Sequence, residues 1–92
     1  MPQREVTIIN RLGMHTRAAA KFVKAAALYE SEIRLIKGDI EVDGKSIISI
    51  MMLAAAKGDR VIIRAIGSDE QKALEDLSKL IGKKFGEDRK GR

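Results

Sequence analysis

The amino-acid sequence predicts an α+β protein in which helices cover one face of a four-stranded sheet. The chain has 92 residues, of which 45% are apolar and 34% charged, the balance of one small globular domain. Apolar residues alternate along four short segments and recur every three to four positions along three others. These segments follow the order β-α-β-β-α-β-α. The pattern leaves open whether the sheet is mixed or antiparallel, and a ferredoxin-like fold shares the first six elements.

The first strand and the first helix are expected near the N-terminus. Residues 4–9 alternate apolar and polar side chains, as a half-buried strand does, and residues 10–13 interrupt the alternation. Residues 16–29 are rich in alanine, and their larger apolar residues recur at helical spacing. We therefore expect an amphipathic helix over these residues that packs closely on the sheet.

The middle of the chain predicts a hairpin followed by a short helix. Residues 32–37 and 40–42 flank the turn pair Gly38-Asp39, so a two-residue hairpin should join two strands. Ser46 is a good N-cap residue, and we expect it to begin a short helix over residues 47–53.

The last strand and the last helix complete the domain. Residues 60–66 are rich in β-branched side chains and predict a strand. Ser68 and Gln71 have the spacing of a capping box, which should begin the last helix. We expect one domain over residues 1–82 and a basic C-terminal tail over residues 83–92.

The formal net charge is +5, and its distribution along the chain is uneven. Residues 6–29 hold four cations and no carboxylate, and the tail is also basic, a balance that suits an anionic partner. Because cysteine is absent and His15 is the only histidine, neither a disulfide nor a multi-histidine metal site can form. We expect no metal and no cofactor. Because no apolar run could span a membrane, we expect a cytoplasmic protein without membrane insertion.

His15 is the strongest candidate for chemistry. It lies just after Gly13 and immediately before the alanine-rich helix, whose first turn offers N–H groups and a positive dipole end. The dipole and the nearby cations disfavour the imidazolium form, so the ring should be a neutral nucleophile. A phosphoryl group on the ring could bind these N–H groups, and Arg17 could add a charge-assisted pair of hydrogen bonds. On spacing alone, an ordinary polar histidine at a helix end explains the pattern equally well.

The short helix over residues 47–53 is apolar on too many sides for a single buried stripe. Ile50 and Leu53 can face the sheet. Three other apolar residues then stay exposed: Ile47, Ile48 and Met51. We expect this exposed patch, close to a basic site, to bind protein partners. Ser46 is explained first as the cap of this helix.

Two segments of the chain resemble a known family. Residues 10–19, Asn-Arg-Leu-Gly-Met-His-Thr-Arg-Ala-Ala, closely resemble the active-site motif of HPr, the histidine-containing phosphocarrier family of the bacterial phosphoenolpyruvate-dependent phosphotransferase system. Residues 44–53 resemble the regulatory-serine segment of that family, and the match stays in register over residues 5–82. Ala18 departs from the family pattern, which usually has proline at that position.

The resemblance implies an open-faced sandwich, with a four-stranded antiparallel sheet covered on one face by three helices. It implies a phosphocarrier that accepts a phosphoryl group on Nδ1 of His15 from phosphorylated enzyme I and passes it to IIA domains. Arg17 would stabilise the phosphoryl group, and Ser46 would be the site used by HPr kinase/phosphorylase. We expect a monomer that binds these partners through Thr16, Lys24, Ile47, Ile48 and Met51.

Two other functions compete with phosphotransfer. A regulatory HPr-like protein would act mainly through phosphorylation of Ser46. A small ferredoxin-like RNA-binding module would explain the basic residues, but none of the three aromatic side chains lies on a predicted strand. Because such modules stack bases on strand aromatics, we expect no binding of nucleic acid.

Overall fold

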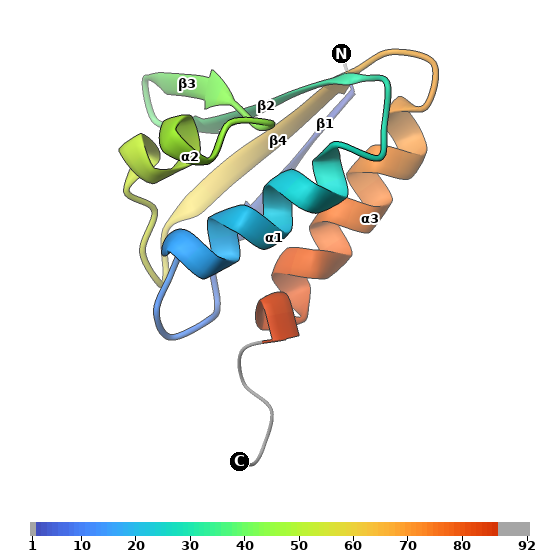
Figure 1. Cartoon of the computed structure of the whole chain (residues 1–92). Helices are drawn as coiled ribbons and strands as arrows, with labels where there is room; N and C mark the ends of the chain where they lie inside the picture. The colour runs from blue at the N-terminus through green and yellow to red at the C-terminus, as the bar shows by residue number, and fades with distance from the viewer. Residues whose placement is uncertain (1, 87–92) are drawn as a thin grey trace.

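The computed structural model describes residues 2–86 and contains a four-stranded sheet with the strand order β1-β4-β2-β3 (Figure 1). The strands are β1 (Gln3–Thr7), β2 (Glu32–Lys37), β3 (Ile40–Asp43) and β4 (Arg60–Ile66). Every pairing is antiparallel, with Val6 opposite Val61 and Leu35 between Ile63 and Val42. The antiparallel sheet that the resemblance implied is confirmed.

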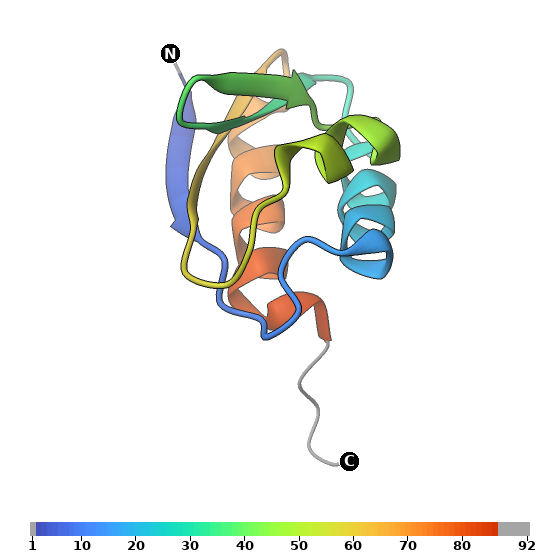
Figure 2. The same ribbon diagram turned by 90° about the vertical axis from the view of Figure 1, so that its left-hand side faces the viewer.

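Three helices lie on the same face of this sheet: α1 (Thr16–Ala26), α2 (Ile47–Leu53) and α3 (Glu70–Gly82) (Figure 2). Every second residue of the central strands faces the helices and is buried, namely Ile33, Leu35, Val61, Ile63 and Ala65. These side chains pack with the apolar stripes of the helices, so the core is one layer between sheet and helices. Within residues 2–86, no helix is both long and apolar enough to cross a membrane.

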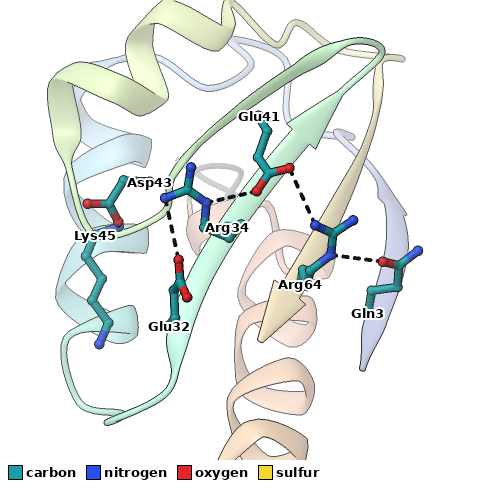
Figure 3. Close-up of polar contacts among 7 residues, drawn as sticks. All are labelled: Gln3, Glu32, Arg34, Glu41, Asp43, Lys45 and Arg64. Atoms are coloured by element: carbon teal, nitrogen blue, oxygen red, sulfur yellow. Dashed lines mark hydrogen bonds and ion pairs between the residues drawn. The ribbon is translucent and has the colours of Figure 1, made fainter. Parts of the chain in front are cut away.

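The opposite face of the sheet is open and carries polar side chains (Figure 3). Glu41 accepts a hydrogen bond from Arg34 Nε at 3.1 Å and another from Arg64 Nη1 at 3.4 Å. Arg64 Nε donates to Gln3 Oε1 at 3.2 Å. Because no helix covers these groups, their ion pairs are partly solvated and each contributes little stability.

The boundaries match the predictions closely in the middle of the chain. β2, α2 and β4 have the predicted bounds. At the N-terminal side, β1 already ends at Thr7, and α1 ends at Ala26 instead of residue 29. The amides of Leu28 and Tyr29 donate to carbonyls three positions back, which tightens the chain after α1 into turns.

The predicted capping box of Ser68 and Gln71 is wrong. The N-cap residue of α3 is Asp69, and its side chain makes no hydrogen bond to its own helix. The Asp69 carboxylate instead accepts hydrogen bonds from the amides of Glu30, at 2.9 Å, and Ser31, at 3.0 Å, and from the Ser31 hydroxyl. The group that could cap α3 therefore holds the connection between α1 and β2.

The first residues after α3 pack against the core. Lys84–Gly86 form a single 3-10 turn, η1, in which Phe85 is only 3% exposed. Lys84 and Phe85 have positive φ values of 58° and 55°, a strained conformation for residues other than glycine. Burial of the Phe85 ring offsets this strain. The rest of the expected tail, residues 87–92, lies outside the described residues.

Candidate functional site

His15 is the N-cap residue of α1, immediately before the helix as the sequence predicted, and the position of Thr16 inside the helix excludes it as the cap. Its backbone is extended, with φ −77° and ψ 177°, and its carbonyl accepts a hydrogen bond from Ala19 N at 2.8 Å. The His15 side chain does not cap the helix, and the first turn of α1 contains no acidic residue. The positive end of the helix dipole therefore meets no carboxylate from that turn.

The segment that precedes His15 is fixed by the turn that follows α2. Met14 N donates to the Ala55 carbonyl at 2.9 Å. Gly13 has a φ of +68°, and a Cβ atom there would lie 2.8 Å from Ala55 O and 2.9 Å from Ala56 Cα. Only glycine permits so close an approach of the two backbones. The buried Asn10 side chain adds a hydrogen bond from Nδ2 to Gly13 O at 2.7 Å.

A pocket of about 270 Å³ lies beside His15. Its lining comes from the segment before α1, from α1 and from η1: Leu12, His15, Arg17, Ala18, Lys21, Phe85 and Gly86. Arg17 and Lys21 bring positive charge, and none of the lining residues within the described part of the chain is a carboxylate. Lys21 Nζ donates to the Phe85 carbonyl at 2.7 Å and so attaches η1 to α1. A pocket of this kind suits a small anion such as a phosphoryl group.

Sequence reasoning did not single out Lys21 or Phe85 as site residues. Lys21 lies four residues after Arg17, which places both cations on one face of α1. Phe85 is the one aromatic residue in an otherwise charged and glycine-containing segment. These signals existed, but neither indicates that the chain after α3 returns to the start of α1.

Ser46 is the N-cap residue of α2, and its Oγ accepts a hydrogen bond from Ser49 N at 3.2 Å. The predicted division of this helix into buried and exposed residues is found, with Met52 as a further exposed residue. Ile50 and Leu53 are buried, whereas four apolar residues are exposed by 38% to 76%: Ile47, Ile48, Met51 and Met52. We call these four residues the α2 patch.

The remaining predicted contact residues, Thr16 and Lys24, are exposed on α1. The structure packs α1 against α2, so both helices belong to one side of the molecule. His15 and Arg17 share the pocket, whereas Ser46 and the α2 patch do not line it. Within residues 2–86, no group of three or more His, Cys, Asp or Glu side chains is arranged to hold a metal ion.

Comparisons with known proteins give a consistent result. A family model described as PTS HPr component phosphorylation site matches residues 2–83. The phosphocarrier protein HPr of Pseudomonas aeruginosa is 48% identical over 88 residues, 95% of this chain and 98% of that protein. The crystal structure of HPr-C-His from Thermoanaerobacter tengcongensis has a TM-score of 0.92 at 39% identity, covering 97% of this chain and 100% of that one. An HPr dimer from the same organism has a TM-score of 0.76 at 40% identity, over 95% and 100%.

The fold, the size and these likenesses define a small phosphocarrier, a protein class that holds a phosphoryl group between other proteins. The chain belongs to the HPr family, the phosphocarriers of the phosphotransferase system. This assignment replaces the alternative of a ferredoxin-like RNA-binding module.

Proposed function

We propose that His15 accepts a phosphoryl group on Nδ1 from phosphorylated enzyme I and passes it to IIA domains. The observation that carries this proposal is the shared pocket of His15, Arg17 and Lys21 at the start of α1. The ring nitrogen attacks phosphorus in line, a P–N bond forms, and the bond between phosphorus and the donor breaks. Transfer to a IIA domain reverses this change, with His15 as the leaving group.

The surroundings of His15 support a charged phosphoryl group. Arg17 can form a charge-assisted fork to two phosphoryl oxygens. The first-turn amides of α1 and its dipole favour an anion at the same place. Stabilisation by preorganised donors is the main contribution that a protein can make to phosphoryl transfer, because little covalent chemistry is left to it.

The docking surface in this proposal is the α2 patch together with Thr16 and Lys24. Ile48 is 76% exposed and Met52 72% exposed, and with Ile47 and Met51 they group exposed apolar side chains on one short helix, as interaction surfaces do. Partners that bind over both helices would cover this apolar surface and also enclose His15. Enzyme I and IIA domains would then use overlapping surfaces and bind one after the other.

Regulation at Ser46 is the second part of the proposal. HPr kinase/phosphorylase would add a phosphate at the N-terminus of α2, where the dipole tolerates negative charge. The Ser46 hydroxyl caps α2 beside the α2 patch, so a phosphate there alters the docking surface instead of unfolding the domain. A protein acting mainly through Ser46 is the alternative, and it predicts kinase labelling without measurable transfer through His15.

Labelling with phosphoenolpyruvate and enzyme I tests the proposal. The chain should take up one acid-labile phosphoryl group, His15→Ala should take up none, and Ser46→Ala should be labelled like the original chain. Labelling of His15→Ala at the original level would overturn the assignment of His15. Treatment with HPr kinase and ATP should give an acid-stable phosphate that Ser46→Ala lacks, and equal labelling of both chains would overturn the assignment of Ser46.

The expected monomer stays a prediction, because a similar solved protein forms a dimer. Light scattering during size-exclusion chromatography measures the mass directly. We expect the mass of one 10.2 kDa chain. A mass of two chains over a range of concentrations would contradict this expectation.

A further inference from the structure

The turn between α2 and β4, residues 54–59, lies beside residues 8–14, the segment between β1 and His15 (Figures 1 and 2). Their backbones exchange three hydrogen bonds. Ile8 N donates to Asp59 O at 2.9 Å, Gly58 N to Ile8 O at 2.8 Å, and Met14 N to Ala55 O at 2.9 Å. The last of these bonds holds the amide next to His15. The position of the His15 backbone therefore depends on the position of residues 54–59.

Lys37, at the end of β2, holds the beginning of this turn. Its Nζ lies 3.0 Å from Asp59 Oδ2, 3.1 Å from the Ala54 carbonyl and 3.4 Å from the Leu53 carbonyl. An ammonium group has three protons, and these three acceptors use all of them. Ala54 has a left-handed φ of 53°, which is unfavourable for alanine. The bond from Lys37 to its carbonyl helps to maintain that conformation.

Asp59 holds the other end of the same turn. Its Oδ2 accepts a hydrogen bond from Ala56 N at 2.8 Å as well as the contact from Lys37. The hydrogen bond from Ala56, followed by that from Lys37, lowers the pKa of the Asp59 carboxyl group below its ordinary value. The carboxylate is therefore charged at neutral pH and connects the turn to β2.

We propose that Lys37 and Asp59 are positioning residues for phosphoryl acceptance at His15. They fix the 54–59 turn, so that the Ala55 carbonyl can hold the Met14 amide and thereby orient His15 toward Arg17. Neither residue lines the pocket beside His15, so neither touches the phosphoryl group. This inference rests on the proposed role of His15. It adds two residues outside the pocket that control the position of His15.

The open face of the sheet provides a matched control. The Arg34–Glu41 pair has a distance of 3.1 Å, like the 3.0 Å of Lys37–Asp59 (Figure 3). Exposure is also similar, with side chains 29% and 42% exposed in the control pair and 32% and 35% exposed in the positioning pair. The two pairs differ in the part of the molecule that they stabilise. Glu41→Gln weakens the ion pairs of Glu41 with Arg34 and Arg64, which are remote from the turn. Asp59→Asn weakens the contacts of Asp59 with Lys37 and Ala56, which fix the turn.

The decisive experiment compares these two variants as substrates of enzyme I with phosphoenolpyruvate. Asp59→Asn should lower turnover about 10-fold with little change in KM, because misplacement of a reacting group acts on the chemical step. Glu41→Gln should stay within about twofold of the original chain, as expected for an exposed pair. Original turnover in Asp59→Asn, or an equal loss in both variants, would overturn the inference.

Two further measurements separate positioning from simple stabilisation. Hydrogen exchange of the Met14 amide should be about fivefold faster in Asp59→Asn, the effect of one weakened hydrogen bond, and unchanged in Glu41→Gln. Lys37→Arg, which keeps the cation, should retain more turnover than Lys37→Met. Unchanged Met14 exchange, or equal turnover of the two Lys37 variants, counts against positioning. If the original chain takes up no phosphoryl group, the proposed function fails instead, whereas Met14 exchange still reports on the turn.

Discussion

The two ends of α1 are held in opposite ways. At the C-terminal end, the Asp69 carboxylate binds the amides of Glu30 and Ser31 and the Ser31 hydroxyl. The Tyr29 hydroxyl nearby donates to the Asp76 carboxylate. At the N-terminal end, His15 begins the helix without an acidic residue in the first turn. Backbone contacts and the remote Lys37–Asp59 pair hold this end in place.

This difference between the two ends of α1 assigns one end to stability and the other to phosphoryl transfer. A carboxylate at the start of α1 would satisfy the amides and the dipole of the helix, but it would occupy the place of a phosphoryl group. The proposed function places no ligand at the far end, where Asp69 and Asp76 act as structural groups. Changes at the far end should therefore alter stability alone, whereas changes at the His15 end should alter transfer.

The largest expected effect is on transfer, in Arg17→Ala. Removing one preorganised donor from the phosphoryl group should reduce the rate of phosphorylation by enzyme I about 100-fold. Arg17 is an exposed residue near the start of α1, so the free energy of unfolding should change by less than about 0.5 kcal/mol. Rapid-quench labelling and urea denaturation measure the two quantities. A loss of stability with a normal rate of phosphorylation would show that Arg17 stabilises the fold and does not act in transfer.

Gly13→Ala should affect both the rate of phosphorylation and the free energy of unfolding, because Gly13 packs the segment before His15 against the 54–59 turn. The added Cβ meets backbone atoms at 2.8 Å and 2.9 Å, and the φ of +68° is unfavourable for alanine. We expect a loss of about 2 kcal/mol in the free energy of unfolding and a slower transfer. Gly38→Ala is the control, since its φ is also positive at +60° but no atom lies within 4 Å of the new Cβ. Equal destabilisation by both variants would assign the effect to φ alone.

Ser31→Ala should affect stability only. Ser31 is 1% exposed, and its hydroxyl donates to Asp69 at the end of α1 that lies away from His15. Loss of this partly buried hydrogen bond to a carboxylate should cost about 1.5 kcal/mol. Phosphorylation by enzyme I should stay within about twofold of the original rate. A transfer defect in folded Ser31→Ala would show that the two ends of α1 are coupled.

The smallest effect concerns the dependence of stability on pH. Hydrogen bonds from the Ser31 hydroxyl and then from the Glu30 amide lower the pKa of Asp69 below its ordinary value. The folded state therefore binds a proton at Asp69 less readily than the unfolded state does. The stabilisation is complete above the ordinary pKa of about 4 and is lost as the pH falls through the lowered pKa. Urea midpoints should fall less steeply with acid in Asp69→Asn, and Asp59, whose pKa is also lowered, should account for part of the remaining slope.

Local patterns predicted the elements that are stabilised locally. The hairpin around Gly38 and the helix capped by Ser46 have the predicted form, because neighbouring residues in the sequence determine them. The capping box at Ser68 failed because α3 begins at Glu70, so Asp69 and not Ser68 is its N-cap residue. The Asp69 carboxylate itself binds a turn almost forty residues earlier in the chain. A carboxylate can serve its own helix or a distant amide, and the sequence does not show which amide will be near.

In the candidate site, too, residues placed by local sequence could be predicted, whereas residues placed by long-range contacts could not. His15 and Arg17 could be predicted because they lie on one helical turn, and the exposed residues of α2 because their spacing exceeds one buried stripe. Lys21 was missed because its contact with Phe85 forms only where the chain after α3 returns to α1. Lys37 was missed because its contact with Asp59 joins the end of β2 to the turn before β4. Both contacts join segments that only the folded chain brings together.

Tyr29 also decides what optical spectroscopy can detect in this protein. It is the only tyrosine, and the chain contains no tryptophan. Its hydroxyl donates to Asp76, and its carbonyl accepts a hydrogen bond from Lys45 Nζ at 2.7 Å. Intrinsic tyrosine fluorescence therefore originates beside the structural carboxylates, at the end of α1 away from His15. It will follow unfolding, whereas a fluorescence assay of phosphoryl transfer needs a chromophore introduced near the pocket.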